Sequence, residues 1–320
     1  MIRELGLKVR IVQFARENYV QALQEGVFAA GFKIEEKNAP QRYQRLYDAA
    51  VQTRDSAETL TIFATDTIIP KKVSGLCIAI QHGIFWDIPR TGNRSLIRQI
   101  AGRAVAAYKI VDRLRRVNRV VCVDYNFLNW YRTQVNKIPG YATVIPNYAS
   151  VAQDYEKKED AIKIIFARRL FTYRGTRVFT EAVRKLLDTG VQIEVTIAGT
   201  GEDEAWMQQQ LKHYDSVRFM TYESHESLEI HKDKHIAVVP TVGSEGTSLS
   251  LLEAMSAQCA VVCSNVGGMT NIVIDGFNGL MVDSGSSRQL YEAMKQLIEN
   301  AELRKKLAHN GYETVRNGFS

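Results

Sequence analysis

Short apolar runs alternate with longer amphipathic segments along the whole chain of 320 residues. This alternation is typical of parallel sheets covered by helices, because strands buried on both faces are apolar throughout whereas helices bury one face. We therefore expect an α/β protein. The expected strands begin at Val9, Phe32, Thr59, Leu76, Arg119 and Ala142 in the first half and at Ile162, Val191, Ser216, His235 and Ala260 in the second.

A polar stretch from Ser150 to Ala161, SVAQDYEKKEDA, interrupts this alternation and has no apolar period of its own. Such stretches are typical of linkers between domains. We expect two Rossmann-like doubly wound domains, residues 1–150 and 151–320, that face each other across a cleft. Ligands of such sheets bind at the carboxyl ends of the strands, so the candidate chemistry should follow strands.

Composition narrows the class of protein only a little. The hydrophobic content of 45% and charged content of 24% are those of a globular protein, and no apolar run approaches the roughly 18 residues of a membrane span. The start, MIRELGLKVRIVQF, lacks a secretory pattern, so we expect a cytoplasmic protein. The net charge of +6 favours an anionic partner, which the charge alone does not identify.

The cysteines and most of the histidines are expected to be structural. Each cysteine lies in an apolar run and no pair has metal or redox spacing, which predicts buried, reduced thiols. The cysteines are Cys77, Cys122, Cys259 and Cys263. Five histidines lie in polar helices or at strand starts and are expected at the surface, namely His213, His225, His231, His235 and His309.

Three arginines, Arg168, Arg169 and Arg174, lie between an apolar strand and a helix expected to begin near Gly175. Guanidinium groups beside a helix N-terminus favour an anion, because the first amides of the helix and its dipole act in the same sense. The segment predicts a phosphate or diphosphate site. The alternative is a solvated arginine cluster paired with surface acids.

The stretch SEGTSLSLLEAMSAQ places two carboxylates, Glu245 and Glu253, around the start of an expected helix. Eight residues of helix span roughly 12 Å, whereas the paired carboxylates of glycoside hydrolases lie at most ~9.5 Å apart. The two acids therefore suit opposite ends of an elongated ligand better than one bond. The alternative is a capping Glu245 and a surface Glu253.

Together these segments resemble the retaining nucleotide-sugar glycosyltransferases of family 4, the glycosyltransferase group 1 enzymes with the GT-B fold. The resemblance rests on FARRLFTYRG, IAGTGE, SEGTSLSLLEAM, SNVGGMTNIVIDGFNGLMVD and TVIPNYAS, and covers about Thr143 to Asp283. The family's two basic residues, five positions apart, match Arg169 and Arg174. Its pair of glutamates separated by seven residues matches Glu245 and Glu253.

The resemblance implies a role for each matched residue. Glu245 would contact the transferred sugar, Glu253 the ribose, and the basic pair the diphosphate. In the first domain, His82 matches a histidine that faces the donor sugar. The remaining implied donor contacts are Gly199 and Gly201 at the nucleotide, Gly246, Thr247, Ser248 and Leu249 at the diphosphate, and Tyr222 near the base.

By this analogy, residues 1–150 form the acceptor-side domain and residues 151–320 the nucleotide-sugar donor domain. The chain departs from the family pattern at Arg168, where the family carries glycine before the first basic residue, and at Asn271, where glutamate is frequent. The first loop, FARENYVQAL, lacks a glycine-rich turn, and the chain ends at RNGFS, before the helix with which relatives continue.

The expected function is a retaining, metal-independent transfer of a sugar from a nucleotide-diphosphate sugar to an acceptor hydroxyl, without a resident cofactor. A nucleotide-sugar epimerase and a non-catalytic nucleotide-sugar-binding subunit are the alternatives. Oxidoreductase chemistry is disfavoured, since no Gly-x-Gly-x-x-Gly follows the first strand. We expect no nucleic-acid partner.

The segment from Arg90 to Arg119 is basic, and its only acid is Asp112. Apolar residues at helical spacing, expected to face the core, are Leu96, Ile97, Ile100, Ala104, Tyr108, Val111 and Leu114. The basic residues left for the outer side are Arg94, Arg98, Arg103, Lys109, Arg113, Arg115 and Arg116. This pattern suggests a peripheral contact with the anionic cytoplasmic membrane and a lipid-linked saccharide acceptor, as in surface-polysaccharide assembly. A solvated face and a soluble acceptor are the alternative.

Overall fold

The computed structural model describes residues 9–24, 26–52, 60–84, 95–136, 141–152, 157, 161–243 and 245–320. The chain divides into two compact units, one of residues 1–81, 104–121 and 134–143 and the other of residues 82–103, 122–133 and 144–320. The expected boundary at residue 150 stays a prediction. Most of the expected linker, residues 153–156 and 158–160, lies outside the described residues.

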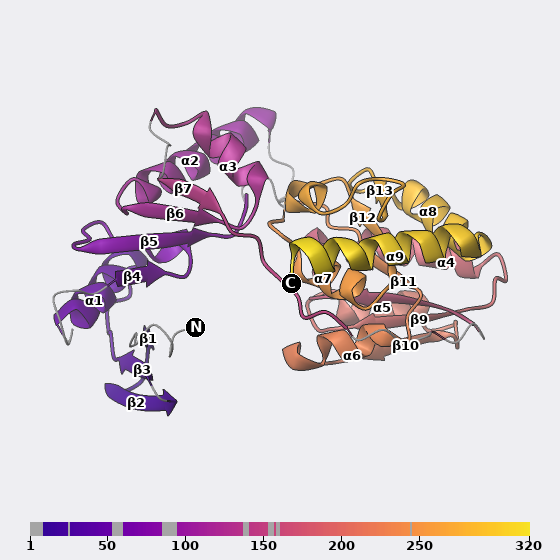
Figure 1. Ribbon diagram of the computed structural model, residues 1–320, viewed down its shortest axis with the longest axis horizontal. Coiled ribbons are helices and arrows are strands. Elements are labelled where there is room, and N and C mark those ends of the chain that lie inside the picture. Colours follow the sequence, from indigo (N-terminus) through magenta and orange to yellow (C-terminus); the bar gives the residue numbers. More distant parts are fainter. Residues whose placement is uncertain are drawn as a thin grey trace. The chain divides into compact units, whose positions relative to one another are not determined.

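The second unit contains a six-stranded sheet in the order β10-β9-β8-β11-β12-β13, in which every pair is parallel. Numbered from its first strand, this is the 3-2-1-4-5-6 order of dinucleotide-binding folds, whose strand order reverses between β8 and β11. Ligands of such sheets bind at that switch point. The strands are β8 (Ile162–Ala167), β9 (Ile193–Ala198), β10 (Val217–Met220), β11 (Ile236–Val239), β12 (Ala260–Ser264) and β13 (Leu280–Val282). The strands β9 to β13 are labelled in Figure 1.

Helices cover both faces of this sheet because alternate side chains of each strand point to opposite faces. On β8, Ile164 and Phe166 belong to one core, with α4, α5 and α8, whereas Ile165 and Ala167 belong to the other, with α6 and α7. The helix α9 contributes to both cores. The α-helices are α4 (Thr176–Leu187), α5 (Glu204–Leu211), α6 (Ser227–Lys232), α7 (Leu249–Ser256), α8 (Ser287–Glu299) and α9 (Ala301–Gly318), with 3₁₀ turns η2 (Thr172–Arg174), η3 (Ser224–Glu226) and η4 (Gly267–Asn271).

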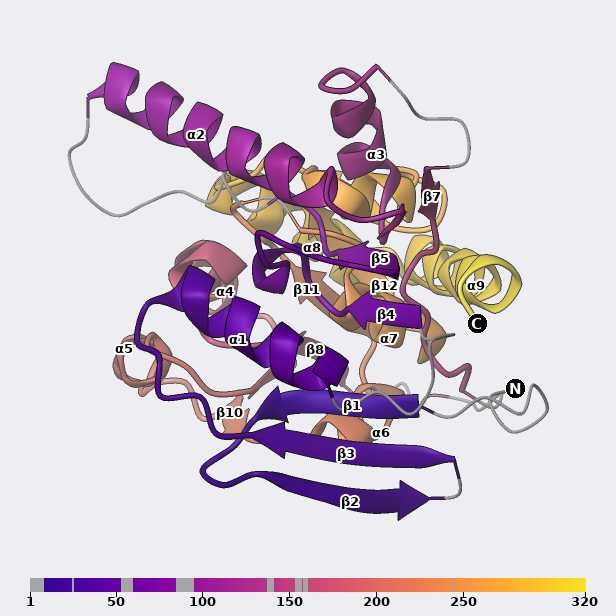
Figure 2. The same cartoon turned by 90° about the vertical axis from the view of Figure 1, so that its left-hand side faces the viewer.

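The first half of the chain contains two smaller sheets, one of order β1-β3-β2 and one of order β4-β5-β6-β7. Figure 2 shows β2 and β3 as a hairpin beside β1. The strands are β1 (Val9–Phe14), β2 (Tyr19–Gln24), β3 (Val27–Phe32), β4 (Leu60–Phe63), β5 (Leu76–Gln81), β6 (Arg119–Cys122) and β7 (Ala142–Val144). The helices are α1 (Ala39–Gln52), η1 (Asp66–Ile68), α2 (Leu96–Leu114) and α3 (Tyr125–Arg132).

The expected strands are found, with one displacement and two omissions. The strand expected to begin at Phe32 instead ends there, as β3. The strand β2, which pairs antiparallel with β3, and the three-residue β13 were not expected. Most of β2 lies within FARENYVQAL, the segment expected to be the first loop.

The cysteine prediction is confirmed, since all four thiols are unbridged and buried. The surface prediction is wrong for two histidines. His231 and His235 are only 1% and 6% exposed. Burial lowers the pKa of His231 to about 4, and its Nδ1 lies 2.6 Å from the Ser227 carbonyl oxygen.

The helix α2 is amphipathic as expected, but the prediction that its apolar face packs against the core holds only near its C-terminus. Val111 and Leu114 are buried. The residues of the same face that are more than half exposed are Leu96, Ile97, Ile100 and Tyr108. Arg90 and Arg94 lie outside the described residues. In the part of the chain that the structure describes, no helix combines the length and apolarity needed to cross a bilayer.

The turn between β8 and α4 depends on Gly175, which has φ +88° and abuts the end of β11. A Cβ atom at this position would lie 1.9 Å from the Pro240 carbonyl oxygen. Gly190 also has positive φ, +76°, but open space around it. Substitutions at the two positions therefore distinguish the cost of a left-handed backbone from the cost of steric overlap.

We expect Gly175→Ala to destabilise the protein more than Gly190→Ala. The left-handed backbone alone costs about 1–2 kcal/mol for alanine, and overpacking at Gly175 adds about 1–3 kcal/mol. Urea unfolding of both variants measures the difference. Equal losses would contradict the tight contact between the β8 and β11 loops.

Candidate active site

The loops after β8 and β11, on either side of the switch point, are joined by backbone contacts. The amide of Val242 donates to the carbonyl oxygen of Tyr173 at 2.9 Å, and Gly175 lies against Pro240. The first loop carries the three arginines and the second carries Glu245. The fold therefore brings these charges to the place where sheets of this order bind ligands.

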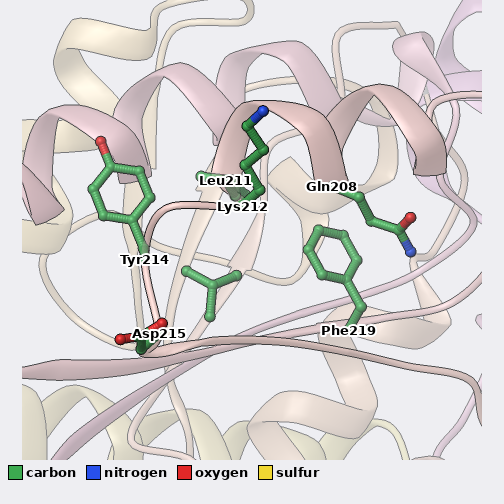
Figure 3. A pocket seen from close by; sticks show the side chains of 7 residues that line it. Gln208, Leu211, Lys212, Tyr214, Asp215 and Phe219 are labelled. Atoms are coloured by element: carbon green, nitrogen blue, oxygen red, sulfur yellow. The ribbon is translucent and has the colours of Figure 1, made fainter.

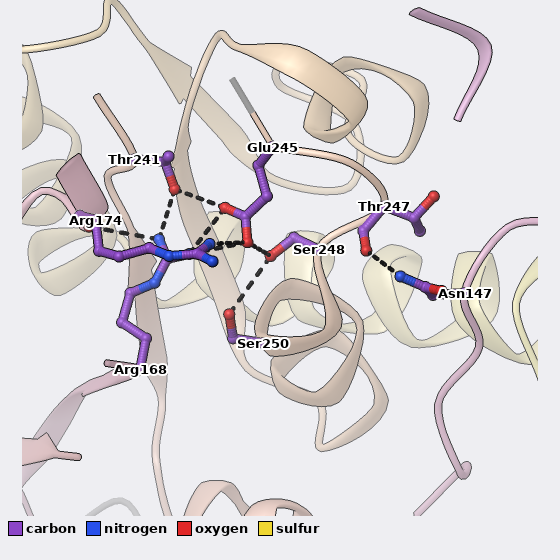
Figure 4. Close-up of polar contacts among 8 residues, drawn as sticks. All are labelled: Asn147, Arg168, Arg174, Thr241, Glu245, Thr247, Ser248 and Ser250. Atoms are coloured by element: carbon purple, nitrogen blue, oxygen red, sulfur yellow. Dashed lines mark hydrogen bonds and ion pairs between the residues drawn. The ribbon is translucent and has the colours of Figure 1, made fainter. Parts of the chain in front are cut away.

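Glu245 lies at the centre of a charged cluster, shown in Figure 4. Arg168 Nη2 donates to both carboxylate oxygens, at 3.1 and 2.8 Å, and Arg174 Nη1 donates to Oε1. Two hydroxyls also donate to the carboxylate, Thr241 Oγ1 at 2.8 Å and Ser248 Oγ at 3.3 Å. We call these five residues the Glu245 cluster.

The Glu245 cluster is largely buried. The side chains of Arg168, Glu245 and Arg174 are 4%, 13% and 19% exposed. Burial alone would raise the pKa of Glu245, but the two guanidinium charges and their hydrogen bonds outweigh it and lower its pKa to about 2. At neutral pH the carboxylate is therefore ionised, and the cluster carries two positive charges and one negative.

The neighbouring Arg169 has a different environment. It is exposed, and its guanidinium lies 5.9 Å from the centre of the Phe171 ring. Of the basic pair expected at the diphosphate, the structure thus brings Arg174 to Glu245. Arg169, on the same loop, lies at the surface. Its contact with a diphosphate stays a prediction.

The glycines after β9 let two loops pack backbone to backbone. A Cβ atom on Gly199, whose φ is +135°, would lie 2.2 Å from the Arg168 carbonyl oxygen, and one on Gly201 would lie 2.3 Å from that of Leu170. Both positions therefore hold the arginine-bearing loop in place. Whether they also line a nucleotide stays a prediction.

Asp203 is a buried anchor that the sequence did not reveal. It is 3% exposed, and its carboxylate accepts hydrogen bonds from Thr172 at 2.8 Å and from Thr176, and pairs with Arg177 at 2.7 Å. These contacts attach the β9 loop to the start of α4. Thr241 was also not expected, because a threonine at a strand end carries no distinctive pattern.

The start of α7 is enclosed. Gly246, Thr247 and Ser248 are buried, whereas Leu249 is half exposed. The Glu245 carbonyl oxygen accepts from the amide of Gly268 at 2.5 Å, so the η4 turn fixes the segment before the helix. The first amides of a helix have no partner within the helix, which makes this end suited to an anion.

Glu253 lies one turn into α7, where its carboxylate accepts from Ser227 Oγ at 2.5 Å. Burial raises the pKa of Glu253, although the Ser227 hydrogen bond opposes it. Burial also raises the pKa of Tyr222, and the charge of Glu253 adds to the effect. Tyr222 therefore lies within electrostatic reach of Glu253. That the two residues form a ribose and base site stays a prediction.

His82 directly follows β5 and is exposed. It belongs to the second unit, where its carbonyl oxygen lies 2.8 Å from the position that a Cβ atom on Gly246 would take. The structure thus brings the His82 backbone to the start of the α7 segment. A contact of its imidazole with a sugar stays a prediction.

Two surface cavities lie away from these residues. One, of about 440 Å³, is lined by Leu211, Tyr214 and Phe219, among others (Figure 3). The other, of about 490 Å³, lies between α4 and α5 around Arg177 and Trp206. Neither contains a residue of the Glu245 cluster, so the chemistry rather than the cavity volume identifies the candidate site. Within the described ranges, no group of three or more His, Cys, Asp and Glu residues is arranged so that it could hold a metal ion.

The parallel sheet with a charged cluster at its switch point defines an α/β protein of the Rossmann class. The profile of the family described as Glycosyl transferases group 1 matches residues 149–314, just over half of the chain. The chain belongs to this family, which confirms the resemblance seen in the sequence.

The curated relatives are similar over the same half. An uncharacterized glycosyltransferase of Methanocaldococcus jannaschii is 28% identical over 183 residues, 55% of this chain and 47% of that protein. The capsular polysaccharide biosynthesis glycosyltransferase CapM of Staphylococcus aureus is 24% identical over 165 residues, 50% of this chain and 43% of that protein. The chain thus spans less than half the length of either relative.

The fold is similar over a longer range. The structure of sucrose-phosphate synthase from Thermosynechococcus elongatus matches with a TM-score of 0.79 at 16% identity, covering 100% of this chain and 86% of that chain. The expected α/β class with two Rossmann-like domains, the GT-B fold, is confirmed.

We expect Glu245→Gln to lower the free energy of unfolding by about 3–5 kcal/mol at pH 7, because it leaves Arg168 as an unpaired buried charge. The depressed pKa of Glu245 means that its contribution is present above pH 4.5 and is lost as the pH falls through about 2. Urea unfolding at pH 7, 4.5 and 3 should therefore show that the loss in free energy of unfolding relative to wild type becomes smaller as the pH falls. The exposed Glu194→Gln is the control, and a difference that persists undiminished at pH 3 would contradict the ion pair.

Proposed function

We propose that the protein transfers a sugar from a nucleotide-diphosphate sugar to an acceptor hydroxyl, with retention of configuration. The observation that carries the proposal is the Glu245 cluster at the switch point, where a buried carboxylate and excess positive charge adjoin a helix start. Membership of the glycosyltransferase group 1 family supports the proposed sugar transfer. No observation favours an epimerase or a non-catalytic subunit.

The charged side chains of the site suit different parts of a nucleotide-diphosphate sugar. Arg174, Arg169 and the first amides of α7 would bind the diphosphate and stabilise the leaving group. Glu245 would face the sugar. Glu253 would accept hydrogen bonds from the ribose hydroxyls, with the base near Tyr222.

The pKa of Glu245 bears on the type of chemistry. A carboxylate with a pKa of about 2 is a weak base at neutral pH, so it suits positioning better than proton abstraction. This agrees with a same-face mechanism in which a donor phosphate oxygen takes the acceptor proton. We also propose that the reaction needs no divalent metal, since arginines and amides supply the positive charge. Transfer that a chelator abolishes and Mg²⁺ or Mn²⁺ restores would overturn this part.

The donor class is tested by thermal shift against a panel of nucleoside diphosphates and nucleotide sugars, followed by a transfer assay with the donor that binds. We expect Arg169→Gln and Arg174→Gln each to weaken donor binding by about 1.5–3 kcal/mol, roughly tenfold to hundredfold, through the loss of a charge-assisted hydrogen bond. Arg184→Gln, at the far end of α4, is the matched control. Wild-type affinity in both site variants would refute the diphosphate site, and an inverted anomer in the product would refute retention.

The helix α2 suggests where the acceptor is found. Its exposed apolar face, from Leu96 to Tyr108, is accompanied by exposed Arg98, Arg103 and Lys109. By contrast, Arg113 pairs with Asp66 at 3.7 Å and Arg116 pairs with Asp112. An apolar stripe edged by basic residues that form no ion pair within the described structure suits an anionic bilayer surface. We therefore propose a peripheral membrane contact and a lipid-linked saccharide acceptor.

Co-sedimentation with liposomes tests the membrane contact. Basic residues contribute about 1 kcal/mol each at an anionic surface, so replacing Arg98, Arg103 and Lys109 by Gln should reduce partitioning roughly hundredfold at low salt. The control replaces Arg184, Lys212 and Arg218, which are exposed in the second unit and give the same change in charge. Equal losses in the two triple variants, or equal binding of wild type to neutral and anionic vesicles, would refute the contact.

A further inference from the structure

The hydrogen-bonding capacity of the Glu245 carboxylate is fully used. Its Oε1 accepts from Arg174, Arg168 and Ser248, and its Oε2 accepts from Arg168 and Thr241. A carboxylate offers about four lone-pair sites, so none is left over. A ligand can gain a hydrogen bond to the Glu245 carboxylate only if one of the present partners moves.

The two arginines differ in their freedom to move. Arg168 is enclosed, with its side chain 4% exposed, and its Nη1 also donates to Thr241 Oγ1 at 2.6 Å. Its Nε is buried and has no hydrogen-bond partner in the described structure. A buried guanidinium in this position depends on its carboxylate partner.

Arg174 is held less firmly. Its side chain is 19% exposed, and the bond from Nη1 to Glu245 Oε1 is its one ion pair with the carboxylate. Its guanidinium also lies 5.1 Å from the centre of the Tyr173 ring. Of the two cations, Arg174 is the one that can turn to an incoming anion.

We propose that Arg168 is a positioning residue, the resident counter-ion of Glu245, which keeps the carboxylate paired while Arg174 turns to bind the donor diphosphate. This inference rests on the proposed function and adds to it a residue that stands where the family pattern has glycine. Without the Arg168 charge, Glu245 and the diphosphate would compete for Arg174. With it, the cluster keeps a net charge of +1 and attracts the donor.

The net charge of the Glu245 cluster provides a test that distinguishes an electrostatic role of Arg168 from a purely structural one. Arg168→Gln brings the net charge of the cluster to zero, whereas the double variant Arg168→Gln, Glu245→Gln restores +1 and releases Arg174. Titration calorimetry with UDP, GDP and ADP should show binding about tenfold weaker in the single variant, and within about threefold of wild type in the double variant. Arg184→Gln, with the same charge change outside the cluster, should bind as wild type does.

Arg168→Lys keeps the charge with fewer directed donors and should also bind within about threefold of wild type. It and the double variant both keep the cluster at +1, so they decide the question even if the single glutamine variant does not fold. A tenfold loss in either would overturn the proposal, as would wild-type affinity in Arg168→Gln. If wild-type protein bound none of the three nucleotides, the proposed function would fail and this inference with it. Nucleotide binding that Arg168→Gln leaves unchanged would remove this inference alone.

Discussion

The ion pair between Glu245 and Arg168 is the interaction on which the rest of the site depends. A carboxylate and a guanidinium buried at a strand end are stable only as a pair, because either charge alone would lose its hydration without compensation. The pair fixes the loop after β8 to the loop after β11. Arg174, the start of α7 and the η4 turn are then arranged around this buried pair.

Much of the second unit could be predicted from the sequence, because its strands are buried on both faces and read as continuous apolar runs. The strand of Ile162–Ala167 and the helix after Gly175 are examples. The hairpin of β2 and β3 was missed because Tyr19–Gln24 mixes polar and apolar residues and gains its order by pairing with β3. The helix α2 was misjudged since helical spacing shows an apolar face without showing what covers it.

The site could be predicted in composition but not in detail. The sequence placed the arginines between a strand and a helix and Glu245 just before a helix, where the structure also has them, since strand ends and helix starts are visible in the pattern. It did not distinguish Arg168 from Arg169, because the alternation of a strand ends with the strand and only the folded loop decides which side chain turns inward. Asp203 contacts residues distant in the chain, and Thr241 links Glu245 to the distant Arg168, which no local pattern records.

The loops of the site are positioned by contacts between main-chain atoms, with Gly199 and Gly201 lying against the backbone of residues 168–170. These main-chain contacts do not involve the side chain of residue 168, so a substitution there leaves them in place. A chain with this loop architecture can alter the electrostatic potential of its ligand site by a single substitution there, without rebuilding the scaffold. The separation of shape from charge makes position 168 a natural place for affinity to be adjusted during evolution or by design.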